Sequence, residues 1–346
     1  MTEAHYGLHE AKPDEVERWN ARAVDAVGGH VYQSRAWAEH RAISGWHPRF
    51  LVFGDGFGVL SLERSWPLVG GASAYLPRGP VPTDGDAALT AERLVAVVGW
   101  LAERGVDVLA SDAEVPAASG YPSRLRASGF RPIEEIQPSR HRMTLSLEGG
   151  EEAVLARIEK KTRNRIRRAE RELTIGEEPD FDLFYDMLRA TGERRQFGFG
   201  PRDEFVAWWR RAHDAGHLLY LDARAPNGVE PIAALLCHRH GGRLSTVHSA
   251  DRAELRRDHP GALALLRWAA IRRAIEEGCA EMDLGGVDIA GARRIPVEGE
   301  PTYGLYDHKR AFSATWLELS GAHERVIRPW RYAIGRLTAR LARSRS

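Results

Sequence analysis

Cysteine, lysine and long apolar runs are all scarce in this sequence. The two cysteines, Cys237 and Cys279, lie far apart in apolar surroundings. They favour buried free thiols in a reducing compartment and exclude a disulfide scaffold or a zinc site. No run of about 18 apolar residues occurs, so no membrane-spanning segment is expected. Residues 1–17 lack the apolar core of a signal sequence. These absences predict a cytoplasmic protein.

A charge excess of either sign is also absent, because 49 basic and 48 acidic residues leave a formal net charge of +1. The two halves differ, however. Residues 1–150 carry 15 basic and 19 acidic residues, a net charge of −4, whereas residues 151–346 have a net charge of +5. We therefore expect a polyanionic partner to bind the second half or a cleft between the halves.

The most basic stretch is residues 156–172, which neither proline nor glycine interrupts. From 157 to 171 it holds eight Arg or Lys residues and two Glu residues. Apolar or small residues recur at spacings of four, four and three, which predicts a narrow stripe on one helix: Ile158, Thr162, Ile166 and Ala169. The other faces are basic and suit a polyanion, and a solvated helix without a ligand is the alternative.

The length of 346 residues suits two domains. Each half contains helices, a hairpin of strands, a long helix and a buried strand. The predicted long helices span 87–104 and 260–278, and the strands that follow them span 106–110 and 280–284. A last helix is predicted over 322–343, in a tail with seven arginines from 325 to 345 and no acid. The pattern predicts an α/β fold of two similar domains, with no coiled-coil arm.

Six short motifs follow one another between residues 33 and 313: Gln33-Ser34-x-x-Trp37, Tyr75-Leu-Pro-Arg78-Gly-Pro80, Asp112-Ala-Glu114, Lys161-Thr-Arg-Asn164-x-Ile-Arg-x-Ala169, Asp283-Leu-Gly-Gly286 and His308-Lys309-x-x-Phe312. In this order they resemble the Fem-type peptidoglycan peptidyltransferases (FemA/FemB/FemX-like), which use aminoacyl-tRNA to extend the peptide of a cell-wall precursor. The resemblance implies an α/β fold of two tandem GNAT (acetyltransferase)-like domains with mixed sheets. Residues 1–150 would bind the acceptor, and residues 151–346 the aminoacyl-tRNA.

The resemblance also implies an acceptor site. Arg41 and Arg202 correspond to basic positions that bind the precursor's diphosphate, and Arg78 lies in a rigid turn that can present its side chain. Asp112 would orient the acceptor amine, or act as its general base. The alternatives are surface arginines, a loop closed by Arg78 and a turn-forming Asp112.

On the donor side, Lys309 is one of only four lysines. The resemblance implies that its ammonium stabilises the negative charge of acyl transfer; the alternative is a surface lysine on a short helix. His308 stands where the family has an aromatic residue, so it would stack on the tRNA 3′ end beside Phe312, and Ser313 departs from the family's glycine. Basic residues of the 156–172 stretch would contact tRNA phosphates: Lys160, Lys161, Arg163, Arg165, Arg167 and Arg168.

The sequence therefore predicts an aminoacyl-tRNA-dependent aminoacyltransferase. Its acceptor would be an amine of a UDP- or lipid-linked muropeptide or a related peptide, and no metal or organic cofactor is implied. One alternative is a CoA-dependent N-acyltransferase. Arg195-Gln-Phe-Gly198-Phe-Gly200 fits a pyrophosphate loop formally, but it lies between two predicted helices. The other alternative is a non-enzymatic basic module that binds nucleic acid or an anionic membrane surface through residues 157–171 and the arginine-rich tail.

Overall fold

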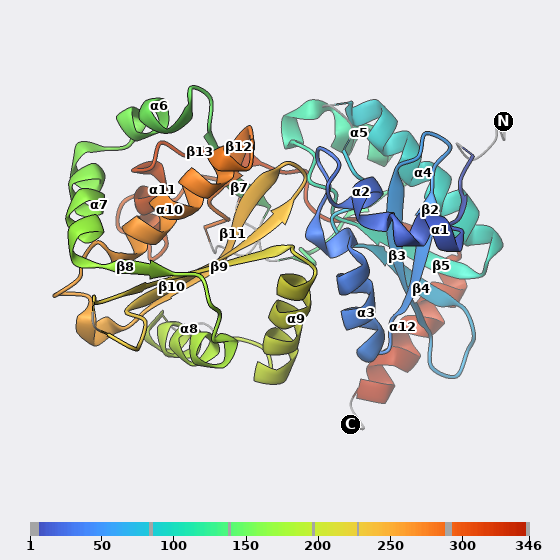
Figure 1. The fold of residues 1–346 in the computed structure, drawn as a ribbon. Helices are drawn as coiled ribbons and strands as arrows, with labels where there is room; N and C mark the ends of the chain where they lie inside the picture. Colours follow the sequence, from blue (N-terminus) through green and yellow to red (C-terminus); the bar gives the residue numbers. More distant parts are fainter. Residues whose placement is uncertain are drawn as a thin grey trace. The chain divides into compact units, whose positions relative to one another are not determined.

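The computed structural model describes residues 7–82, 86–137, 140–195, 198–226, 228–287 and 293–343. Contacts divide the chain into two compact units (Figure 1). Unit 1 takes its described residues from 7–140, Arg293 and 318–343, and unit 2 takes its own from 141–287 and 294–317. The C-terminal segment thus returns to the first unit, a feature that the predicted division at residue 150 does not include.

Unit 1 contains a mixed seven-stranded sheet in the order β1-β2-β3-β4-β5-β14-β6. β4 and β5 are parallel, and the other neighbouring pairs are antiparallel. The strands are β1 (His9–Glu10), β2 (His47–Val52), β3 (Gly58–Ser65), β4 (Ala72–Leu76), β5 (Val106–Ser111), β6 (Arg131–Pro132) and β14 (His323–Val326). The helices are α1 (Pro13–Glu17), α2 (Trp19–Ala23), α3 (Arg35–Ile43), α4 (Ala87–Glu103), α5 (Tyr121–Ala127) and α12 (Pro329–Arg343).

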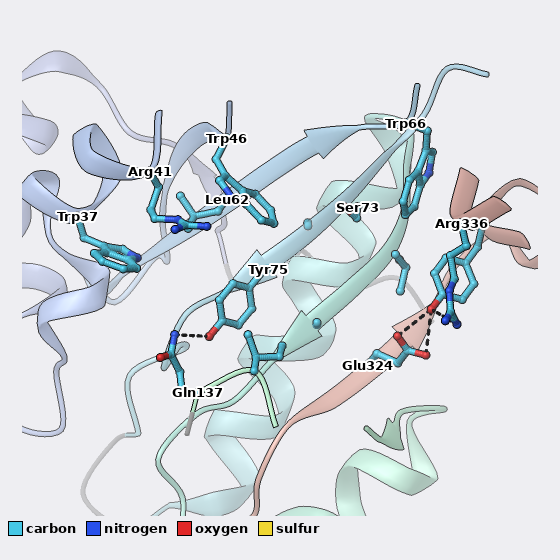
Figure 2. A pocket seen from close by; sticks show the side chains of 15 residues that line it. Trp37, Arg41, Trp46, Leu62, Trp66, Ser73, Tyr75, Gln137, Glu324 and Arg336 are labelled. Carbon is cyan, nitrogen blue, oxygen red and sulfur yellow. Dashed lines mark hydrogen bonds between the residues drawn. The ribbon is translucent and has the colours of Figure 1, made fainter. Parts of the chain in front are cut away.

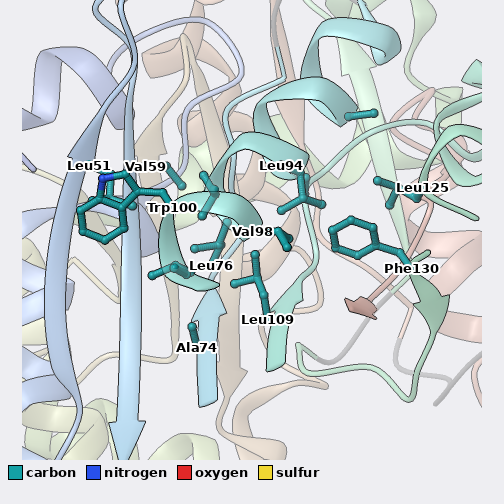
Figure 3. Close-up of a cluster of buried hydrophobic side chains, with 14 of the residues drawn as sticks. Leu51, Val59, Ala74, Leu76, Leu94, Val98, Trp100, Leu109, Leu125 and Phe130 are labelled. Carbon is teal, nitrogen blue, oxygen red and sulfur yellow. The ribbon is translucent and has the colours of Figure 1, made fainter. Parts of the chain in front are cut away.

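The two faces of the unit 1 sheet are covered differently. On one face, apolar residues of α4, such as Leu94 and Val98, pack on strand residues Leu51, Leu76 and Leu109 (Figure 3). On the other face, the short helices α2 and α3 contribute a smaller cluster around Trp19, Ala38, Leu60, Leu62 and Tyr75. This incomplete cover leaves room for the pocket described below.

Unit 2 contains the second mixed sheet, in the order β13-β7-β12-β11-β10-β9-β8. Its strands are β7 (His141–Ser146), β8 (Thr174–Gly176), β9 (Leu218–Arg224), β10 (Ala233–His240), β11 (Arg243–Asp251), β12 (Glu281–Asp283) and β13 (Thr315–Glu318). Its helices are α6 (Gly150–Arg157), α7 (Lys160–Glu172), α8 (Phe181–Arg195), α9 (Arg202–Asp214), α10 (Ala262–Glu276) and α11 (Tyr303–Arg310). None of the helices in the described ranges is long and apolar enough to cross a membrane.

Both units repeat one arrangement. In unit 1 the long helix α4 connects the parallel pair β4 and β5, and in unit 2 α10 lies between the parallel strands β11 and β12. A parallel pair requires a crossover connection of this length. The predicted α/β fold of two domains with mixed sheets is confirmed.

The prediction of a single last helix over 322–343 was wrong at its start. Residues 323–326 form β14, which pairs with both β5 and β6. The helix begins only at Pro329, because proline suits the first helical position, where no backbone N–H donor is required.

The basic stretch is likewise interrupted, although its sequence predicts one helix. α6 ends at Arg157, Ile158 is extended with φ −68° and ψ 140°, and α7 starts at Lys160. Ile158 is buried, and the Glu159 N–H donates a hydrogen bond of 2.9 Å to the carbonyl of Ala311. These two tertiary contacts outweigh the local preference for an unbroken helix.

Candidate functional site

A pocket of about 520 Å³ opens on the less covered face of the unit 1 sheet. Its floor includes Tyr75 of β4 and Val108 of β5. Figure 2 shows Trp37 and Arg41 of α3 on one side and Arg336 of α12 on the other. Aromatic rings and two arginines thus line a cavity large enough for a small organic group or a short peptide.

Arg41, predicted to bind the acceptor, lines this pocket. The Ser34 hydroxyl accepts a hydrogen bond of 3.0 Å from the Trp37 backbone N–H and so caps α3. The Arg41 guanidinium lies 5.4 Å from the Trp37 ring and 5.6 Å from the Trp46 ring. The two indoles hold the cation by cation–π attraction, so Arg41 is positioned at the pocket wall.

Asp112 lies directly after β5 and is buried. Its carboxylate accepts hydrogen bonds from the Arg78 backbone N–H at 2.6 Å and from the Tyr75 hydroxyl at 2.9 Å. Burial raises the pKa of Asp112 above its ordinary value of 3.8, while the Arg78 guanidinium opposes that shift. Because Tyr75 lines the pocket, the hydrogen bond from its hydroxyl connects the buried Asp112 carboxylate to the pocket.

Arg78 is a partner of Asp112 in this structure. Its side chain is 11% exposed, and its guanidinium lies 3.7 Å from Asp112 and 3.9 Å from Glu114. Its backbone has a φ of 55°, in the left-handed region, and the Gly79-Pro80 bond that follows is cis. The turn directs the Arg78 cation at two buried carboxylates.

Two residues of this cluster carried no predicted role. Tyr75 connects Asp112 to the pocket, and Gln137 donates a hydrogen bond of 3.3 Å to the Tyr75 hydroxyl. The sequence offered one clue to a role for Tyr75, which is its place in the Tyr-Leu-Pro-Arg motif. Gln137 follows no pattern in the sequence.

In unit 2, Lys309 is buried, with 4% of its surface exposed. Its ammonium donates hydrogen bonds to the carbonyls of Gly285, at 2.9 Å, and Gly286, at 2.5 Å. The alternative of a surface lysine is therefore wrong. The two carbonyls fix the ammonium at one point of the turn after β12.

Gly285 was predicted only to let the chain turn after the strand, with no chemical role, and its position does require glycine. Its φ is 77°, and an added Cβ would lie 2.8 Å from the Thr246 carbonyl oxygen and 3.5 Å from Lys309 Nζ. Glycine therefore allows the turn to approach β11 closely while its carbonyl accepts from the lysine.

His308 and Phe312 flank Lys309. Their ring centroids lie 5.6 Å apart in an edge-to-face arrangement, and Phe312 is fully buried. Arg267 of α10, which the sequence did not single out, lies 5.9 Å from the Phe312 ring. Burial lowers the pKa of Arg267 to about 10. Phe312 therefore lies in the core of unit 2.

The basic helix α7 begins beside α11. The Glu159 N–H bonds the Ala311 carbonyl, two residues from Lys309, and the Glu159 carboxylate lies 3.4 Å from Arg310. As predicted, α7 buries three residues of its stripe, Thr162, Ile166 and Ala169. The basic face of α7 therefore starts close to the buried lysine.

The six predicted RNA-contacting residues differ in their present partners. Arg163 donates to the carbonyl of Ala156 at 2.8 Å, and Arg168 pairs with Glu172 at 2.7 Å. The other four are exposed, with no ion-pair partner among the described residues: Lys160, Lys161, Arg165 and Arg167.

Arg202, predicted to bind the acceptor with Arg41, lies at the first position of α9 in unit 2. Its guanidinium is 3.2 Å from Asp182 and 3.6 Å from Asp186, both on α8. The formal fit to a pyrophosphate loop, Arg195 to Gly200, includes residues 196 and 197, which lie outside the described ranges. The part that is described follows a helix rather than a strand.

The comparisons with known proteins find similarity to acyltransferases. The Acetyltransferase (GNAT) domain family matches residues 158–310. A Lipid II:glycine glycyltransferase of Staphylococcus saprophyticus is 27% identical over an alignment of 207 residues that covers 55% of this chain and 48% of that protein. The chain thus spans about half the length of this curated relative.

Among solved structures, one described as FemX superposes with a TM-score of 0.79 at 17% identity, covering 94% of this chain and 99% of that one. L-PGS from Bacillus licheniformis superposes with a TM-score of 0.50 at 12% identity, over 96% and 98% of the two chains. The structural matches establish the fold. Together with the glycyltransferase relative, they confirm the resemblance to the Fem-type family that the motifs predicted.

Proposed function

We propose that this chain, which resembles the Fem-type peptidyltransferases in motifs and fold, is an aminoacyltransferase acting on a peptidoglycan precursor or a related peptide. The donor is aminoacyl-tRNA, and the acceptor is an amine on a UDP-linked or lipid-linked muropeptide. The name of the Staphylococcus saprophyticus relative supports a lipid-linked acceptor and an amino-acid donor. No metal or organic cofactor takes part in this proposal.

The buried Lys309 ammonium is the observation that carries the proposal. An enzyme that transfers an acyl group must stabilise the oxyanion that forms on the attacked carbonyl. Lys309 is held in a glycine turn, and α7, with its exposed cations, starts beside it. A fixed cation close to a basic helix suits an ester carried at the end of an RNA.

The reaction follows from these parts. The acceptor amine attacks the ester carbonyl of the aminoacyl-tRNA, forming a C–N bond. The ester C–O bond then breaks, and the ribose hydroxyl leaves with a proton that the amine releases. The ester is already activated, so Asp112 is required only to orient the amine through Tyr75.

The unit 1 pocket is the proposed acceptor site. Arg41 offers a cation for a phosphate, since guanidinium groups bind phosphate bidentately, and the indoles of Trp37 and Trp46 keep it in place. The role proposed for Arg202 requires it to exchange its two carboxylate partners for the acceptor.

Replacing Lys161 and Arg165 with glutamine is expected to weaken tRNA binding and to flatten its salt dependence. Each lost phosphate contact removes about 0.7 to 0.9 from the slope of log K against log salt concentration. Filter binding over a series of NaCl concentrations measures both effects. Arg189→Gln on α8 is the control, because Arg189 is an exposed arginine outside α7 and pairs with Glu193. Equal slopes for the double variant and the control would contradict an RNA-binding role for α7.

Transfer of a labelled amino acid tests the function directly. Total tRNA charged with each labelled amino acid is incubated with the chain and with UDP-linked or lipid-linked pentapeptide. The expected result is acceptor-dependent release of free tRNA together with a labelled peptide product. Acyl transfer from acyl-CoA, with none from any charged tRNA, would instead assign the GNAT-like unit to the CoA-dependent class.

A further inference from the structure

The C-terminal helix α12 carries its apolar residues on the side that faces solvent. Trp330, Ile334, Leu337 and Leu341 recur at spacings of four, three and four, which places them within about 60° of the helix circumference. They are 68%, 42%, 59% and 53% exposed. A helix that packs on a globular core buries such a stripe. α12 instead turns its apolar stripe to solvent.

The other side of α12 is fixed to unit 1. Gly335 is buried against the Trp66 indole, where an added Cβ would lie 2.4 Å from the ring. The buried Asp107 carboxylate accepts a hydrogen bond of 2.9 Å from Trp66 Nε1 and lies 3.4 Å from Arg331 Nε. These contacts hold the apolar stripe outward.

A second element adds apolar side chains next to the helix. The loop 66–71 between β3 and β4 exposes Leu68, at 96%, and Val69. It contacts α12 through Trp66, whose ring centroid lies 6.2 Å from that of Tyr332. Figure 1 shows α12, in red, along unit 1. Half of the large exposed apolar side chains found in the described ranges thus come from these two contacting elements.

The charges on this helix are all of one sign. α12 contains four arginines and no acidic residue, and Arg336 and Arg340 are exposed. An apolar stripe that includes tryptophan, with arginines beside it, is typical of a helix lying in the interface of an anionic bilayer. Unlike a bilayer, RNA would leave the apolar stripe in water, and a second copy would bring two arginine rows together.

We propose that α12 and the loop 66–71 form a docking surface for an anionic phospholipid bilayer. Trp330, Ile334 and Leu337 enter the headgroup region, and Arg340 contacts lipid phosphates. Tyr332 and Arg336 of the same helix line the pocket, so docking brings the pocket to the membrane surface, where a lipid-linked acceptor is carried. Only this last consequence rests on the proposed function.

Co-sedimentation of the full chain with vesicles tests the surface. Vesicles of equal parts phosphatidylglycerol and phosphatidylcholine should bind the chain, and the binding should weaken as NaCl is added. The double variant Trp330→Ser/Leu337→Ser should lower the partition coefficient about tenfold or more. Val229→Ser and Val297→Ser, which change exposed apolar residues of unit 2, should bind like the unmodified chain.

The proposal is overturned if the unmodified chain stays in solution with anionic vesicles at low salt, or if the double variant binds them equally well. A dimer that the double variant loses, without any vesicle binding, would assign the stripe to a second copy. Stem RNA that binds the unmodified chain better than the double variant, again without vesicle binding, would assign it to RNA. Lys309→Met should bind vesicles normally, so vesicle binding without any transfer activity would contradict the proposed function and not this surface.

Discussion

Replacing Lys309 with methionine is expected to lower the rate of aminoacyl transfer about 100- to 1,000-fold, the usual loss when one oxyanion-stabilising group is removed. The carbonyls of Gly285 and Gly286 hold the ammonium in place before the substrate arrives. Such a cation stabilises the developing charge with no cost of reorganisation. The measurement is the single-turnover rate at saturating aminoacyl-tRNA, where weaker binding does not contribute.

Two control variants separate chemistry from support of the turn. Lys309→Arg keeps the positive charge but spreads it over a planar guanidinium. Its transfer rate should therefore lie between those of the unmodified chain and Lys309→Met. Lys161→Met removes an exposed lysine of α7 and should change tRNA binding but not the single-turnover rate. Because the methionine leaves two partly buried carbonyls without their donor, at a cost of up to about 1–3 kcal/mol each, thermal unfolding is measured alongside. If the transfer rate falls only in proportion to the loss of folded protein, Lys309 has a structural role and not a catalytic one.

The features that the sequence predicted well are those that local patterning decides. The buried stripe of α7 could be predicted from the sequence, because Thr162, Ile166 and Ala169 share one helical face whatever they pack against. Lys309 stood out because lysine is rare in an arginine-rich chain. Its glycine partners could not be found in this way, since a backbone carbonyl has no signature in the sequence.

The features that were missed depend on contacts between distant segments. Residues 323–326 follow no strand alternation strong enough to oppose a helix, and their pairing with β5 and β6 makes them a strand. The break at Ile158 depends on the bond from Glu159 to Ala311, about 150 residues later in the chain. The Tyr75–Asp112 contact joins two strand ends that only the fold brings together.

Asp112→Asn is expected to lower the transfer rate about 10- to 100-fold and to remove an acidic limb from the pH–rate profile. The ionised carboxylate accepts from the Tyr75 hydroxyl, which lines the acceptor pocket. Burial raises the pKa of Asp112 above 3.8, so the limb should lie above the range of an exposed carboxylate. Asparagine keeps a hydrogen-bond acceptor for the Tyr75 hydroxyl but does not titrate. The transfer rate of the variant should therefore not change on the acidic side of the pH profile.

The stability of the same variant gives a second, independent readout. Because the folded pKa of Asp112 is raised, the folded state binds the proton more tightly than the unfolded chain does. This contribution is complete below pH 3.8 and is lost as the pH rises through the folded pKa. The difference in unfolding free energy between the two proteins, measured by denaturant titration from pH 3 to pH 8, should change in that window and stay constant above it. Tyr75→Phe decides how Asp112 acts: an equal loss of rate makes Asp112 a positioning residue that works through Tyr75, whereas a much smaller loss means that the carboxylate contacts the amine itself.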